Sequence, residues 1–230
     1  GDARNMVLIA ERAKRRFEDP ADQEIQPFTM GCHSNGQLFL LPEILRNLAE
    51  AHPNIHPQLT VVPYKHLYRL LVEDDVDVVV SFRESSGKKM PFLYNELRSV
   101  PVVGYCAESH PLAGHTILTK EDLDREVLIL TDPRKSSDKL AELLVGLLES
   151  HPASEIFFCD SEEVAVTFAL AGYGIAILPE LFIPQELSLS RIPIHGLEPL
   201  SFGVYYKTLN GNPLLKDFIH FAQTCFASRK

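Results

Sequence analysis

The sequence predicts an α/β protein of two lobes, each built on a mainly parallel β-sheet. At 230 residues and 45% apolar content, the chain is long enough for one large domain or for two lobes of about 100 residues each. Short apolar runs alternate with longer stretches of helical periodicity, first over residues 26–82 and again over residues 126–180. This alternation is typical of parallel strands joined by helical crossovers.

Composition argues against nucleic acid or a membrane as a direct partner of this segment. The formal net charge is −9 at pH 7, which repels phosphate, and there is no long stripe of Lys and Arg. No run of about 18 uncharged apolar residues occurs, and the apolar run at residues 6–10 is too short for a signal-peptide core. We therefore expect a cytoplasmic chain with no membrane contact.

The cysteines and short motifs predict neither a metal site nor a cofactor site. The four cysteines lie far apart without a CxxC pair, which favours reduced, buried thiols over a disulfide framework or a zinc site: Cys32, Cys106, Cys159 and Cys225. No GxxxxGK, HExxH or GxSxG motif is present. The glycines of AGYGIAIL close a helix instead of opening one, so they do not form a dinucleotide fingerprint.

Residues 1–20 predict an amphipathic helix that ends at Pro20. Apolar side chains recur at three- and four-residue spacing, with charged residues mostly on the other face: Met6, Ile9, Ala10, Ala13 and Phe17. This helix has nothing of its own to pack on. We interpret it as a connector to an element upstream.

Residues 26–82 predict a βαβαβ unit. Its first helix is expected to present one inward stripe, with Pro42 tolerated in the first turn: Leu38, Leu41, Leu45 and Leu48. Three consecutive valines at 78–80 predict a strand that is covered on both faces. A second unit follows, and periodicity alone allows the last strand and helix to join either lobe.

The turn GCHSNG, between the first strand and the first helix, is the most informative local feature. Ser34 or Asn35 can cap the helix, whose free amides and positive dipole end attract anions. Ligands of open parallel sheets bind outside the carboxyl ends of the strands, so a carboxylate-bearing metabolite could be held there. Ordinary helix capping with no ligand is the alternative.

The ends of other strands are expected to face the same cleft: Ser81 and Phe82, Thr131 and Asp132, and Asp160 and Ser161. Capping explains Asp160 better than ligand binding does, and Ser161 is a secondary candidate. Cys32 beside His33 could instead be an activated thiol, because a helix N-terminus and a protonated imidazole both favour thiolate.

From Phe28 to Phe226 the order of segments resembles the effector-binding domain of LysR-type transcriptional regulators. The resemblance rests on a strand ending at Gly31, followed by LFLLPEILRNLAEAHPNI, LTVV, LYRLLVEDDVDVVV, ESHPLA and LAGYGIAILPE at their spacings. It implies a periplasmic-binding-protein-like (type 2) fold, with two Rossmann-like subdomains joined by two crossover strands. The effector would lie in the cleft between them.

The resemblance divides the chain into the end of a dimerisation linker helix at residues 1–20, regulatory subdomain I at 25–100 and 201–230, and regulatory subdomain II at 101–200. By position, the family's effector contacts fall on His33, Ser34, Asn35, Tyr64, Ser81, Phe82, Thr131 and Asp132. A homodimer or homotetramer is implied, and DNA would be bound only by a winged helix-turn-helix domain N-terminal to this segment.

The leading hypothesis is thus a bacterial sensor of a small, anionic or carboxylate metabolite, which needs no catalysis, cofactor or metal. A free-standing solute receptor has the same fold and is the alternative, while an enzyme that uses Cys32 is a third hypothesis. The loop RESSGKKM departs from the family pattern. Arg83, Lys88 and Lys89 could place positive charge at the cleft mouth, or this loop could be simply solvated.

Overall fold

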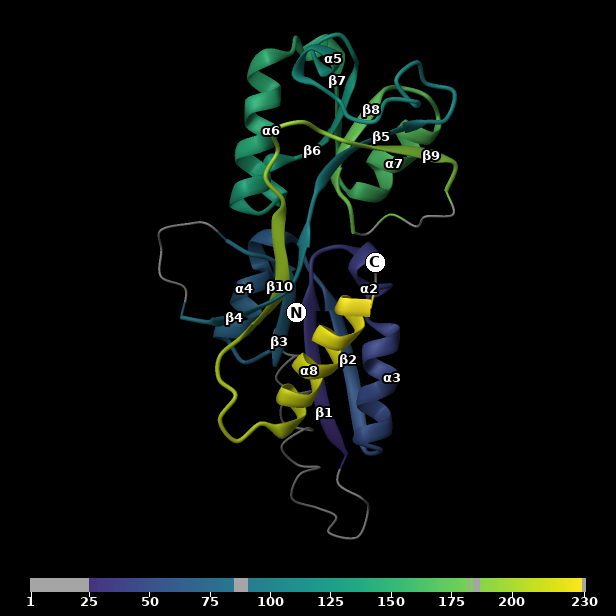
Figure 1. Cartoon of the computed structure of the whole chain (residues 1–230). Helices are drawn as coiled ribbons and strands as arrows, with labels where there is room; N and C mark the ends of the chain where they lie inside the picture. The colour runs from purple at the N-terminus through teal and green to yellow at the C-terminus, as the bar shows by residue number, and fades with distance from the viewer. Residues whose placement is uncertain (1–24, 85–90, 182, 184–186, 229–230) are drawn as a thin grey trace.

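The computed structural model describes residues 25–84, 91–181, 183 and 187–228. The expected helix before Pro20, together with Lys88 and Lys89, lies outside these residues. The chain folds into two lobes, which Figure 1 shows one above the other, and each lobe has one five-stranded sheet. The two-lobed α/β fold that the sequence predicts is therefore confirmed.

The first lobe combines the N-terminal part of the chain with its C-terminal end. Its strands are β1 (Gln26–Cys32), β2 (Ile55–Val61), β3 (Val78–Phe82), β4 (Leu93–Val100) and β10 (Leu200–Tyr206). Its helices are α2 (Asn35–Leu38), α3 (Pro42–Ala51), α4 (Tyr64–Val72) and α8 (Pro213–Ser228). The strand order is β2-β1-β3-β10-β4, so the last strand enters the middle of this sheet.

The second lobe is formed by the central part of the chain. Its strands are β5 (Val102–Ala107), β6 (Leu128–Thr131), β7 (Ile156–Cys159), β8 (Ile175–Pro179) and β9 (Leu189–Pro193), in the order β7-β6-β8-β5-β9. Its α-helices are α5 (Lys120–Leu123), α6 (Asp138–Ser150) and α7 (Glu162–Leu170), and its short 3-10 turns are η1 (Pro133–Lys135) and η2 (Ala153–Glu155).

The two sheets follow the same plan. In the first sheet β1 pairs in parallel with β2 and β3, and in the second β6 pairs in parallel with β7 and β8. β10 and β5 each add antiparallel pairs. The chain passes between the lobes from β4 to β5, across Pro101, and again from β9 to β10. The two crossovers and the return of the last strand and helix to the first lobe follow the expected fold.

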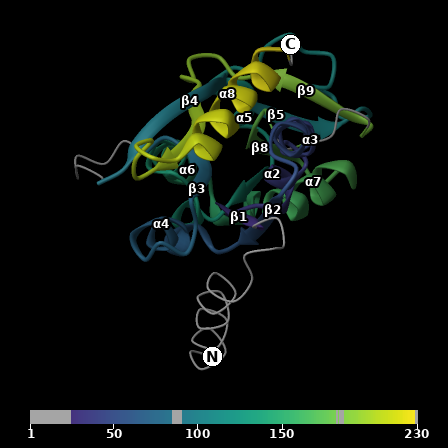
Figure 2. The same ribbon diagram turned by 90° about the horizontal axis from the view of Figure 1, so that it is seen from below.

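Helices cover both faces of the first sheet, with α3 and α8 on one side and α4 on the other (Figure 2). Val78 and Val80 pack in the core with α3 and α8, whereas Val79 packs with Leu67 and Leu71 of α4. All five residues of β3 are buried. The consecutive valines of this strand are explained by apolar contacts on both of its faces.

The segment after β1 differs from the single helix predicted for it. It forms the short α2 and then α3, because Pro42 starts a new helix at its first position. Leu41 and Leu48 of the expected stripe are buried, but Leu38 and Leu45 are only half-buried and Ile44 is buried in addition. The prediction of one helix was therefore wrong, whereas Leu41, Leu45 and Leu48 of the predicted inward stripe do pack in or against the core.

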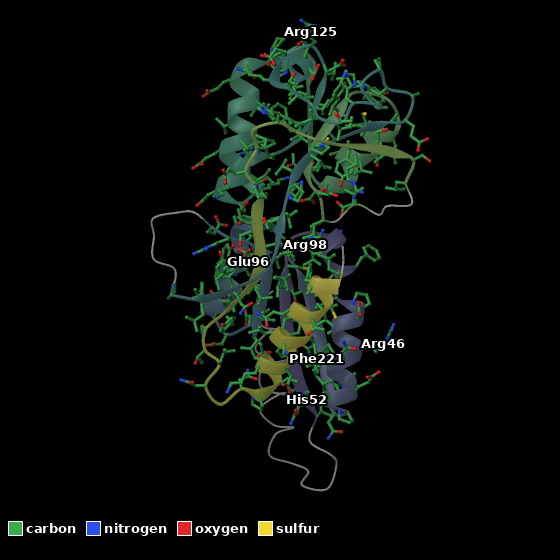
Figure 3. The ribbon with its side chains drawn as sticks, in the orientation of Figure 1. Arg46, His52, Glu96, Arg98, Arg125 and Phe221 are labelled. Carbon is green, nitrogen blue, oxygen red and sulfur yellow. The ribbon has the colours of Figure 1, made fainter. Side chains whose placement is uncertain are left out.

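The contact between α3 and α8 also includes a polar link at the end of α3. His52, labelled in Figure 3, has its Nε2 atom 2.8 Å from Oδ2 of Asp217 on α8. Because His52 caps α3, this link ties the C-terminal end of that helix to the last helix of the chain. In the part of the chain that the structure describes, no helix is long and apolar enough to cross a membrane.

Gly203 of β10 offers a test of the close packing in the first sheet. A Cβ atom built on Gly203 would lie 2.2 Å from the backbone oxygen of Asn95 on β4, at a register shift between these strands. We predict that Gly203→Ala lowers the free energy of unfolding by about 1–3 kcal/mol, as overpacking does. Gly146→Ala on α6 is the control. Apart from the neighbouring backbone of its own helix, no described heavy atom lies within 4 Å of its Cβ position, and alanine favours helices by roughly 0.5–1 kcal/mol.

Urea denaturation of the parent chain and both variants measures these changes in the free energy of unfolding. A Gly203→Ala chain as stable as the parent chain would contradict the described approach of β4 and β10.

Candidate functional site

The two lobes meet at the carboxyl ends of their parallel strands. Residues that directly follow β1 and β3 in the first lobe contact the N-terminal ends of α7 and α6 in the second. In addition, α4 contacts η1, the turn that follows β6. We call this region the interlobe boundary. Strand ends and helix N-termini of both lobes therefore converge there, which is the usual location of ligands in open parallel sheets.

The turn after β1 is fixed by a capping box. The Ser34 hydroxyl accepts a hydrogen bond from the Gly36 amide at 3.2 Å, and the Gln37 side chain accepts one from the His33 amide at 2.9 Å. Ser34 and Gln37 are buried. The predicted role of Ser34 as a helix cap is confirmed, whereas Asn35 is exposed as the first residue of α2.

His33 turns toward the second lobe. Its ring packs edge-on against Tyr64 at 5.1 Å between centroids, and its Nε2 atom lies 3.9 Å from Oε1 of Glu162 at the start of α7. The side chains of His33 and Glu162 are only 9% and 15% exposed. Burial lowers the pKa of His33 to about 4, despite the nearby negative charge of Glu163. His33 is therefore neutral at pH 7.

Glu162 brings a carboxyl group of the second lobe to the capped turn of the first. Burial raises the pKa of Glu162, and the charge of Glu163 acts in the same direction, while its own amide and the Ser34 hydroxyl oppose this shift. The Nδ1 atom of His33 is buried and has no hydrogen-bond partner among the described residues. This part of the boundary thus contains a desolvated carboxyl group and an unused imidazole nitrogen.

Glu84 makes the reciprocal contact, from the first lobe to the second. Its Oε2 atom accepts a hydrogen bond from the Asp138 amide at the start of α6 at 3.2 Å, and its Oε1 atom accepts one from the Tyr68 hydroxyl at 3.1 Å. The Glu84 amide in turn donates to the Tyr205 hydroxyl at 2.7 Å. Burial raises the pKa of Glu84 to about 7, while the hydrogen bond from the Asp138 amide lowers it and the Asp138 carboxylate raises it.

Strand ends hold three further residues that were predicted for the site: Ser81, Phe82 and Thr131. Ser81 and Thr131 are buried at the ends of β3 and β6. Phe82 has its side chain in the core, 5.2 Å from the Phe202 ring centroid, so only its carbonyl oxygen faces Tyr68, at 3.4 Å from the hydroxyl. The effector contact expected of Phe82 stays a prediction.

Asp132 and Ser161 have local partners. Asp132 caps η1 and holds the Arg134 guanidinium, with an Oδ2 to Nη2 distance of 2.7 Å. Ser161 caps α7 by accepting a hydrogen bond from the Val164 amide at 3.4 Å. Asp160 pairs with Lys135 at 2.7 Å. The capping role considered for Ser161 is confirmed, and any ligand role for it stays a prediction.

Four residues of the boundary have no counterpart among the residues predicted for the site: Tyr68, Glu84, Ser137 and Glu162. Glu162 was visible only as an acidic residue in a first helical turn, and Glu84 only as part of a polar loop. Their importance comes from contacts across the boundary with residues far away in the sequence. The nearest available signal was their position directly after a buried strand or at a helix N-terminus.

Cys32 does not have the surroundings of an activated thiol. It is buried, and this burial raises its pKa to about 11. The neighbouring His33 is neutral, so it supplies no positive charge to favour thiolate. All four cysteines are buried thiols outside any disulfide, and no cluster of metal-binding side chains is found among the residues that the structure describes.

The raised pKa of Glu84 predicts a pH dependence of stability. The folded chain binds this proton more tightly than the unfolded chain, in which the carboxyl group has its ordinary pKa of 4.5. The contribution of Glu84 to the free energy of unfolding should therefore decrease as pH rises from about 4.5 through about 7. Glu84→Gln should flatten this decrease, measured by urea denaturation across the pH range.

A carbon-detected NMR titration of the carboxyl groups should show one midpoint near 7 that disappears in Glu84→Gln. A Glu84 midpoint close to 4.5 would show that the side chain is solvated and not held at the boundary.

Comparison with known proteins agrees with the resemblance seen in the sequence. The family model described as "LysR substrate binding domain" matches residues 21–226. The HTH-type transcriptional regulator CbbR of Rhodospirillum rubrum is 24% identical over 203 residues, which is 87% of this chain and 65% of the relative. The first relatives are longer proteins, and this chain spans 54% to 65% of their length.

Solved structures of low identity share the fold. The effector-binding domain of BenM with its effector benzoate has a TM-score of 0.70 at 20% identity, with 88% of this chain and 92% of that chain covered. Full-length CbnR with its target DNA has a TM-score of 0.73 at 16% identity, covering 97% and 78%. Since the family model matches most of the residues, this chain belongs to the LysR substrate-binding domain family.

Proposed function

We propose that this chain is the effector-sensing part of a bacterial LysR-type transcription regulator, with the effector bound at the interlobe boundary. Family membership supports the regulatory role, and the relatives matched over most of this chain are transcriptional regulators. The observation that supports the location is the convergence of buried polar groups from both lobes. Ser34 and Ser81 come from the first lobe, and Thr131 and Ser137 from the second.

The same arrangement suggests how binding would control the rest of the regulator. A ligand that contacts both lobes favours whichever lobe arrangement it fits best, and so changes the populations of the two arrangements. In the proposed protein this change would be transmitted to a winged helix-turn-helix domain upstream of the chain. BenM binds benzoate and CbnR binds DNA, as their structures record, so both properties exist within the same fold.

We further propose that the domain acts in the cytoplasm as a homodimer or homotetramer, and not as an enzyme. The carboxyl ends of the strands supply hydrogen-bonding groups at the boundary, while Cys32 is protonated and buried. Regulators need a folded binding site but no nucleophile. The effector contacts that we propose are His33, Ser34, Tyr64, Ser81 and Thr131, and further candidates are Asn35, Phe82, Asp132 and Ser161.

A thermal-shift screen of small metabolites tests this function, because a ligand of the folded state raises the melting temperature. We predict that Ser34→Ala weakens binding of a stabilising compound by about 2- to 10-fold, the usual worth of one hydrogen bond. Thr119→Ala is the matched control, since Thr119 also forms a capping box but on α5. Each change should cost about 1 kcal/mol of stability by loss of a cap.

Titration calorimetry measures ligand affinity separately from the loss of stability that either variant causes. Equal affinity of the parent chain and Ser34→Ala for every stabilising compound would argue against the boundary as the effector site.

A further inference from the structure

We infer that the effector presents a protonated amine to an acceptor-rich part of the interlobe boundary. This part, which we call the acceptor cluster, consists of Tyr68, Ser81, Glu84, Ser137 and Asp138. The inference rests on the proposed function and adds the chemical class of the ligand. It differs from the anionic ligand expected from the turn after β1.

Glu84 is the centre of the acceptor cluster. Tyr68 and the Asp138 amide each donate one hydrogen bond to it, at 3.1 and 3.2 Å. An ionised carboxylate can accept about four hydrogen bonds, so further acceptor positions remain. The Asp138 carboxylate lies close enough to raise the pKa of Glu84, which places a second negative charge at the same end of α6.

Two buried hydroxyl groups of the acceptor cluster could accept a hydrogen bond from a ligand. Ser81 is 0% exposed and Ser137 is 2% exposed, and neither Oγ atom has a hydrogen-bond partner of acceptable geometry among the described residues. Ser81 lies close enough to the Tyr68 hydroxyl to lower the pKa of Tyr68, but without good hydrogen-bond geometry, and the Tyr68 hydroxyl donates to Glu84 instead. Ser137 directly precedes the amide that binds Glu84, and its hydroxyl does not cap α6. Buried polar atoms without partners are rare in folded proteins.

Three described positive charges near the acceptor cluster, those of Arg83, Arg134 and Lys135, have partners other than Glu84. Arg134 binds Asp132 and Lys135 binds Asp160, each at 2.7 Å. The Arg83 guanidinium lies over the Tyr94 ring at 5.6 Å. Arg125 lies at the far end of the second lobe in Figure 3. Within the described part of the chain, these residues therefore provide no counter-ion for Glu84.

The other polar part of the boundary contains an unpaired amide nitrogen of Gln37 but also a carboxyl group of its own. His33 is neutral, and Glu162 already brings a carboxyl group to Ser34 and His33. A carboxylate ligand would meet Glu162 there and Glu84 at the acceptor cluster. An ammonium group, in contrast, has three donors and would pair with Glu84 while donating to the serine hydroxyls.

Matched compounds test the charge preference directly. Benzylamine, benzyl alcohol and benzoate share one carbon skeleton, as do butylamine, 1-butanol and butyrate. Each is titrated at constant ionic strength and about pH 8, where Glu84 is ionised, while amide signals are followed by NMR. We expect each amine to bind at least about tenfold more tightly than its carboxylate and to shift the amides of Glu84 and Asp138.

Substitutions in the acceptor cluster test whether the bound amine lies at Glu84. Glu84→Gln should weaken amine binding at least about tenfold and leave alcohol binding unchanged, because a hydrogen bond to a charged group is worth more than a neutral one. Glu73→Gln is the control for the loss of one negative charge, since Glu73 is exposed at the end of α4. Ser137→Ala should cause a smaller loss of about threefold and serves as a second variant if Glu84→Gln unfolds the domain.

The possible outcomes separate the two proposals. Carboxylates that bind more tightly than amines and shift boundary amides would overturn the amine inference but support the proposed function. Amine binding that is equal in Glu84→Gln and the parent chain would reveal general attraction to an acidic protein, and would also overturn it. Binding by none of the six compounds would overturn the amine inference too, while the metabolite screen still decides the proposed function.

Discussion

Helix N-termini and strand ends from two lobes are buried against each other at the interlobe boundary, and their free amide groups need acceptors. The first amides of a helix have no partner within the helix and carry partial positive charge. The chain supplies acceptors across the boundary. Glu84 of the first lobe binds the start of α6, and Glu162 of the second lobe lies against the capped turn of α2. Each lobe thus places a carboxyl group at a helix end of the other.

These reciprocal contacts are specific but not strongly stabilising. Both carboxyl groups are desolvated, which is why burial is the main cause of their raised pKa values. Burial of a charged group is costly unless it is paired and fully hydrogen-bonded. A ligand that supplies the missing partners would stabilise the boundary, so an arrangement of this kind is well suited to sensing a small molecule.

Periodicity in the sequence was sufficient to predict most strands and helices. Three consecutive valines correctly indicated a doubly covered strand, and Ser34 was correctly selected as a cap. The break between α2 and α3 was missed because the leucine spacing continues across Pro42, although proline at a first helical position begins a helix. Phe82 was selected by its place at a strand end, but the direction of its ring depends on the contact with Phe202.

The acceptor cluster could not be predicted in the same way, since its members meet only after both lobes have folded. Glu84 and Asp138 are 54 residues apart, and no local pattern connects a loop glutamate with a particular helix start. The family resemblance placed the effector between the two lobes, but it did not identify Glu84 or Asp138 as residues of the site. The hydrogen-bonding state of a side chain, such as the unused hydroxyls of Ser81 and Ser137, becomes visible only in three dimensions.

Amide hydrogen exchange with and without a stabilising compound shows whether both lobes contact the ligand, because it locates the binding region without any assumption about ligand charge. If the compound binds at the interlobe boundary, protection increases at residues 33–37 and 81–84 of the first lobe and at residues 131–138 and 161–164 of the second. Protection confined to one lobe, or to the α3 and α8 face of the first sheet, would contradict binding at the boundary.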